Sequence, residues 1–70
     1  MLKRAVRKVL KVLVDRGDFD NIQEAWTVHR EDFIELDNLI TIHPEDAEEF
    51  FTDTFSLEID FFEEILFASI

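Results

Sequence analysis

The side chains in this sequence most able to do chemistry are carboxylates, because Asp and Glu make up 17 of the 70 residues and Cys is absent. The densest group follows the single proline and consists of Glu45, Asp46, Glu48, Glu49 and Asp53. Two carboxylates act as general acid and base only when their surroundings push their pKa values apart. The sequence gives no pair of these acids such contrasting apolar neighbours. We therefore expect a solvated acidic face, and not an enzyme.

The two histidines are the next candidates for catalysis. His29 has the spacing of an apolar helix face, and His43 directly precedes the proline. Neither has a Ser or Cys at a spacing that would pair it with a nucleophile. We expect His29 to be a hydrogen-bonded residue either within the core or at its boundary. Asp18 and Asp20 resemble the start of a calcium loop, but the required glycine and glutamate do not follow, so no metal or cofactor is predicted.

The charge changes sign at Gly17. Six basic residues and one acid precede this glycine, giving +5, whereas the remainder holds Arg30 and sixteen acids, giving −15. The overall charge of −10 repels phosphates, which argues against direct binding of nucleic acid. We expect docking on a basic protein surface through Glu45, Asp46, Glu48, Glu49 and Asp53.

A second function stays open for the acidic segment. Carboxylates one helical turn apart can imitate a row of phosphates. A surface of this kind suits a nucleic-acid-mimicking inhibitor of a DNA- or RNA-binding protein, as in phage anti-restriction or anti-CRISPR proteins. Solubility of a Phe-rich small protein is the alternative explanation of the same charge.

The basic segment before Gly17 could itself bind a partner. A basic amphipathic helix can lie on an anionic membrane, but so short a chain needs the apolar stripe for its core. No run of 18 apolar residues occurs either, and we expect no membrane binding. Basic helices can also meet acidic faces of other copies, so a homo-oligomer is a further candidate. The absence of Cys is compatible with the reducing cytoplasm, where we expect the protein to work.

A single domain over residues 1–70 must position these groups, since Gly and Pro occur once each and no linker or repeat is present. Apolar spacing predicts a first helix over residues 2–16, ended by Gly17. Its apolar stripe includes Leu2, Val6, Val9 and Leu13. A second helix is predicted from Asp20, with Gln23 completing a capping box.

A third helix is predicted to begin at Pro44, because proline suits the first helical position and the acids that follow favour the positive end of the helix dipole. Its buried stripe consists of Ala47, Phe50, Phe51, Thr54 and Phe55. Residues 55–61 alternate between apolar and polar as a strand does, so a short strand pair with residues 39–42 is an alternative there. The fold class predicted is mainly α, a compact bundle of three to four helices.

Three segments give the chain a resemblance to acyl carrier proteins, the small acidic helical bundles that carry acyl chains on a phosphopantetheine arm. They are Phe33-Ile34-Glu35, Asp46-Ala47-Glu48-Glu49-Phe50-Phe51 and Phe55-Ser56-Leu57-Glu58-Ile59. The family attaches its arm to the serine of Asp-Ser-Leu, and gapless spacing places Thr41 at that position. The resemblance implies the bundle fold and an acidic recognition helix without a prosthetic group. Attachment of the arm to Thr41 is the remaining alternative.

Overall fold

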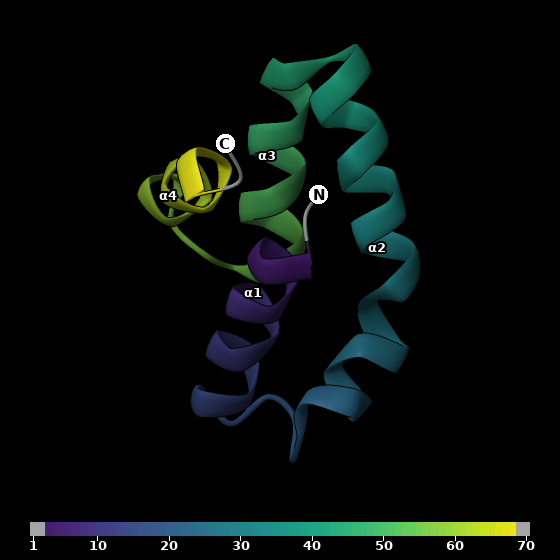
Figure 1. The fold of residues 1–70 in the computed structure, drawn as a ribbon, viewed down its shortest axis with the longest axis vertical. Coiled ribbons are helices and arrows are strands. Elements are labelled where there is room, and N and C mark those ends of the chain that lie inside the picture. Colours follow the sequence, from purple (N-terminus) through teal and green to yellow (C-terminus); the bar gives the residue numbers. More distant parts are fainter. Residues whose placement is uncertain (1–2, 69–70) are drawn as a thin grey trace.

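The computed structural model describes residues 3–68, which form four helices (Figure 1). They are α1 (Lys3–Asp15), α2 (Ile22–Ile42), α3 (Pro44–Phe55) and α4 (Ile59–Ala68). The radius of gyration is 11.2 Å, and a compact chain of this length is expected to have about 11 Å. The prediction of a mainly α, compact bundle of three to four helices is confirmed, with four helices in the described part.

The long helix α2 packs against both α1 and α3, and α4 packs against the same two helices from another side (Figure 1). All four helices contribute to one core, whose buried members are Ala5, Val9, Leu10, Leu13, Ala25, Phe33, Leu36, Ala47, Phe51, Phe55, Phe62 and Ile65. Of the stripe predicted for the first helix, Val9 and Leu13 are buried and Val6 is half-buried, whereas Leu2 lies outside the described residues. Within residues 3–68, no helix combines the length and the apolar character needed to cross a membrane.

Aromatic rings connect α2, α3 and α4 inside this core. The ring centroid of Phe51 lies 4.7 Å from that of Phe62 and 5.3 Å from that of Phe55. Phe55 lies 5.1 Å from Phe33, which in turn stacks on Trp26 at 5.9 Å. Pairs at these separations are each worth about 0.5–1.5 kcal/mol beyond their burial. Of the stripe predicted for α3, Ala47, Phe51 and Phe55 are buried in this core, whereas Phe50 and Thr54 are only half-buried.

The end of α1 is tied to the end of α3 by Arg16. Gly17 ends α1 as predicted, with a φ of +90° that a side chain would strain. The Arg16 guanidinium donates hydrogen bonds to the carboxylate of Asp18 and to two backbone oxygens, that of Phe55 at 2.8 Å and that of Ser56 at 3.0 Å. These carbonyls belong to the C-terminal end of α3, where backbone oxygens lack helical partners.

The start of α2 differs from the prediction by one residue. The N-cap is Asn21, whose side-chain oxygen accepts a hydrogen bond from the backbone N–H of Glu24 at 2.8 Å. The predicted cap at Asp20, with Gln23 in a capping box, is wrong. Both residues can cap a helix, and the choice between neighbours depends on the path of the loop after Gly17.

The alternative strand pair between residues 39–42 and 55–61 is also wrong, since residues 3–68 contain no strand. Residues 39–42 form the last turn of α2, which ends because Pro44 disfavours the helical conformation at His43. Residues 55–61 cover the end of α3, a linker and the start of α4. Their alternation arises because a helix end and a helix start happen to place apolar side chains two residues apart.

Replacing Arg16 with alanine should lower the free energy of unfolding by about 1–2 kcal/mol, because hydrogen bonds from charged donors are lost at a partly exposed site. Urea unfolding followed by circular dichroism measures this change. Arg4→Ala is the matched control, since Arg4 is an exposed cation of α1 without an ion pair to a described residue. Equal losses of unfolding free energy in Arg16→Ala and Arg4→Ala would contradict the role of Arg16 in joining the ends of α1 and α3.

Replacing Ser56 with glycine should stabilise the fold by about 0.5–1 kcal/mol, because Ser56 caps α3 in the left-handed region that glycine enters without strain. Its φ is 53°, and its side chain is exposed. The expected result is a higher melting temperature for Ser56→Gly than for the wild type. A Ser56→Ala variant that melted as high as Ser56→Gly would show that the backbone conformation is not the reason.

Candidate functional site

The outer face of α3 carries three of the five acids predicted to bind a partner. Asp46, Glu49 and Asp53 lie one turn apart on the helix and line a shallow hollow of about 320 Å³. The other residues that line it are Leu39, Phe50 and Thr54. We call Asp46, Glu49 and Asp53 the acidic row. It places carboxylates beside half-buried apolar side chains, a combination found in protein interfaces.

The remaining two predicted acids do not join this hollow. Glu45 is exposed in the first turn of α3, and Glu48 is half-buried on the flank of the helix. Glu45 and Asp46 both occupy the first turn, where the helix dipole stabilises negative charge. Three of the five predicted acids therefore line one hollow, and the five-residue site stays a prediction.

No cation of the described chain neutralises the acidic row. Among residues 3–68, ion pairs join Arg16 to Asp18 and His29 to Asp32, and neither involves the row. Like charges three or four residues apart on a helix destabilise it by about 0.2–0.5 kcal/mol per pair. The row therefore costs stability in the free protein, and a basic surface placed against it would remove that cost.

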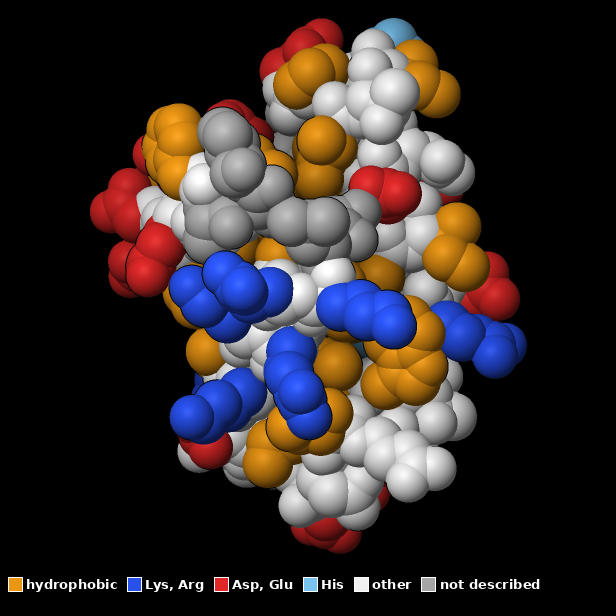
Figure 2. All heavy atoms as spheres, in the orientation of Figure 1, with side chains coloured by type: hydrophobic (Ala, Val, Ile, Leu, Met, Phe, Trp, Pro, Cys, Tyr) orange, Lys and Arg blue, Asp and Glu red, His pale blue; other side chains and the backbone are white. Residues whose placement is uncertain are grey.

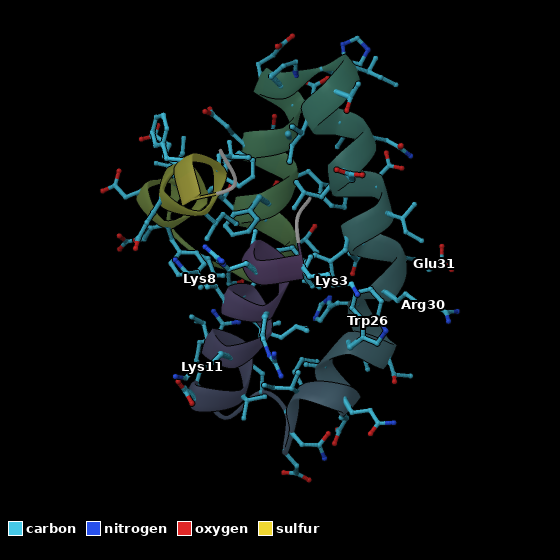
Figure 3. The ribbon with its side chains drawn as sticks, viewed as in Figure 1. Lys3, Lys8, Lys11, Trp26, Arg30 and Glu31 are labelled. Carbon is cyan, nitrogen blue, oxygen red and sulfur yellow. The ribbon has the colours of Figure 1, made fainter. Side chains whose placement is uncertain are left out.

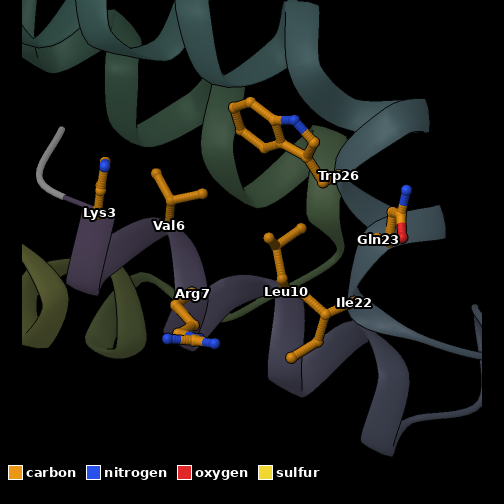
Figure 4. A pocket seen from close by; sticks show the side chains of 7 residues that line it. All are labelled: Lys3, Val6, Arg7, Leu10, Ile22, Gln23 and Trp26. Atoms are coloured by element: carbon orange, nitrogen blue, oxygen red, sulfur yellow. The ribbon is translucent and has the colours of Figure 1, made fainter.

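A second surface, which the sequence did not predict, is a hollow of about 650 Å³ between α1 and α2 (Figure 4). Its lining residues are Val6, Leu10, Ile22 and Trp26, with Lys3, Arg7 and Gln23 beside them. Trp26 and Phe33 lie seven residues apart on α2, a spacing that places them on one face of a helix. The two rings do stack, yet Trp26 stays 39% exposed. The sequence does contain one indication of this surface: α2 carries more apolar residues than one helix face can bury.

Basic side chains cover the face of α1 seen in Figure 2, and two of them, Lys3 and Arg7, line this hollow. All five are exposed, namely Lys3, Arg4, Arg7, Lys8 and Lys11, and Lys3, Lys8 and Lys11 are labelled in Figure 3. None of them forms an ion pair with another described residue. Lys3 and Arg4 also stand in the first turn of α1, the end at which the helix dipole disfavours positive charge. These cations do not stabilise the fold through specific pairs.

His29 is held by its neighbours. Its Nδ1 lies 2.8 Å from a carboxylate oxygen of Asp32, and its ring packs between Phe19 and Phe55 at centroid distances of 5.5 and 5.0 Å. This hydrogen-bonded position at the boundary of the core is one of the two expected from the sequence. The described residues also include no group of three His, Asp or Glu side chains placed to hold a metal ion.

Thr41, the alternative attachment residue for a phosphopantetheine arm, is part of a helix. It lies in the last turn of α2, before α3 begins, and its hydroxyl donates a hydrogen bond to the backbone oxygen of Asp37 at 3.3 Å. The residue at the spacing of the carrier serine thus belongs to the end of a helix, with its hydroxyl turned to the backbone.

Removing the central charge of the acidic row should stabilise the fold. Glu49→Gln removes three like-charge pairs, those with Glu45, Asp46 and Asp53, so we expect the free energy of unfolding to rise by about 0.6–1.5 kcal/mol at low ionic strength. Added salt screens such repulsion and should shrink the gain. Chemical unfolding at low and high salt measures both effects. A variant no more stable than the wild type at low salt would contradict the repulsion described above.

No protein-family model, curated protein or solved structure matches this chain. The resemblance to acyl carrier proteins stays a prediction.

Proposed function

We propose that this protein is a non-enzymatic binding module whose acidic row docks on a basic surface of a partner protein. One observation carries the proposal: Asp46, Glu49 and Asp53 stand together on one face without an ion pair to a cation of the described chain, and they line a hollow that also holds Leu39 and Phe50. The module works in the cytoplasm and needs no prosthetic group.

Rigidity of the surface supports this role. The inner face of α3 is fixed by Phe51 and Phe55, which are fully buried, and α3 is packed on both flanks by α2 and α4. A binding surface carried by a well-packed helix loses little entropy when a partner docks. Complementary charges then fix orientation and speed association, while the half-buried Phe50 and Leu39 offer apolar contact. The acyl carrier resemblance gives the recognition role to the same helix.

A second candidate is a nucleic-acid-mimicking inhibitor of a DNA- or RNA-binding protein. The observation that favours it is the placement of the acids: no charged residue of the described chain is buried, so the acids on α2, α3 and α4 all meet solvent. A mimic would use acids over several helices, whereas the module proposed above uses α3 alone. Substitutions on separate helices therefore discriminate between the two.

Charge reversal on α3 tests the proposal. The partner is first identified by affinity capture from the native host and mass spectrometry, and its affinity is then measured by calorimetry. Glu49→Lys with Asp53→Lys should weaken binding at least about tenfold, because two contacting charges become repulsive. Glu31→Lys with Glu35→Lys makes the same charge change at exposed positions of α2 and should bind as the wild type does. Circular dichroism confirms that both variants fold.

The same variants decide between the two candidates. Unchanged affinity of the α3 variant would refute docking through the acidic row. Equal weakening by the α2 and α3 variants, together with competition between this protein and DNA or RNA for the partner, would indicate mimicry. Simultaneous binding of nucleic acid and this protein to the partner would exclude mimicry.

A further inference from the structure

The hollow between α1 and α2 continues along α2 as a groove. A second hollow of about 220 Å³ shares Val6 and Trp26 with the first and extends to Phe33, Ile34, Asp37 and Asn38. From Ile22 to Asn38 the two hollows follow α2 for about 24 Å, at the rise of an α-helix. We call this feature the Trp26 groove. It is long enough to receive a short helix.

Apolar side chains stay exposed along the Trp26 groove. Trp26 is 39% exposed, Ile22 is 37% exposed and Ile34 is 52% exposed. In Figure 4, Val6 and Leu10 of α1 point toward the indole of Trp26. Contiguous apolar surface with a central tryptophan is typical of interfaces. The occupant must therefore be apolar on the side that enters the groove.

The charge beside the Trp26 groove determines the rest of the occupant's chemistry. Lys3 and Arg7 line the groove on the α1 side, and the other exposed cations of α1 are nearby (Figure 2). None is paired within residues 3–68. An occupant that combines an apolar contact with two or more carboxylates would satisfy both features.

The chain's own α4 has this chemistry. Phe67 is 72% exposed and Ile59 is 42% exposed, and the helix also presents the exposed acids Asp60, Glu63 and Glu64. Glu63 and Glu64 lie one turn before Phe67, so all three share one side of the helix. The ten-residue helix is about 15 Å long and fits within the groove. α4 packs on α1 and α3, away from the groove (Figure 1), so only another copy can supply it.

We infer that the Trp26 groove binds α4 of a second copy of this chain, with Phe67 beside Trp26 and the two glutamates opposite Lys3 and Arg7. When two copies exchange α4 reciprocally, a two-fold symmetric dimer fills both grooves. The acidic row on α3 takes no part in this contact. The inference therefore does not depend on the proposed function.

Sedimentation equilibrium and tryptophan emission test this dimer. Trp26 is the sole tryptophan, so its emission reports on the groove directly and should move to the blue as the protein dimerises from micromolar to millimolar concentration. Phe67→Ala should weaken dimerisation at least about tenfold, because a buried aromatic contact is lost. Ile42→Ala is the matched control, since Ile42 is 66% exposed on α2 outside the groove; it should dimerise as the wild type does.

Charge exchange then tests the register. The double variant Lys3→Glu with Arg7→Glu should not self-associate. The double variant Glu63→Lys with Glu64→Lys should not self-associate either. An equal mixture of these two variants should form a heterodimer, because opposite charges then face each other again. Glu49→Lys with Asp53→Lys should dimerise normally even where it fails to bind the partner. A chain that is monomeric at every concentration, or dimers that tolerate Phe67→Ala, would overturn the inference. So would a monomer whose Trp26 emission shifts on adding dodecanoate, because a lipid would then occupy the groove.

Discussion

Phe51 and Phe55 on α3 make the ring contacts on which the other helices depend. Phe51 reaches α4 through Phe62, and Phe55 reaches α2 through Phe33. Next to Phe55, the guanidinium of Arg16 holds the end of α3 against the end of α1. A chain of this size has only a few kcal/mol of net stability, about 3–5 at most from a single core. The position of every surface described above follows from these contacts.

The charge division along the sequence becomes a division in space. Basic residues cover α1 beside the Trp26 groove, and the acids cover the outer surfaces of α2, α3 and α4. Across residues 3–68 the two sets are not joined by ion pairs, apart from Arg16 with Asp18 close to it in sequence. A fold optimised for stability alone would intersperse the signs. Separating the signs gives up stabilising ion pairs, and this loss is understandable if each charged face meets an oppositely charged surface. Both the proposed function and the inferred dimer include such a contact.

Local signals predicted the end of α1 and the start of α3. Gly17 enters the left-handed backbone region without strain, and Pro44 fixes its own φ at a helical value, so both positions follow from residue type. The inner face of α3 was also predictable, because its spacing has a single period over the whole helix. The continuity of α2 was not, since the apolar spacing loses its helical period before residues 39–42, which could equally have been a short extended piece or a connector. The Trp26 groove was not predictable from the sequence either, because only the position of α1 relative to α2 shows that Trp26 stays exposed.

Which of the five predicted acids line one hollow could be predicted from the sequence only in part. Asp46, Glu49 and Asp53 share a face by helical spacing alone, but Glu48 needed the packing of the neighbouring helices to be recognised as half-buried. The most direct test of the central claim is a nuclear magnetic resonance titration of the isotope-labelled chain with its captured partner. We predict that the largest amide shifts fall on α3 from Asp46 to Asp53. Largest shifts on α1 and at Trp26, with α3 unchanged, would contradict the claim that the acidic row is the docking surface.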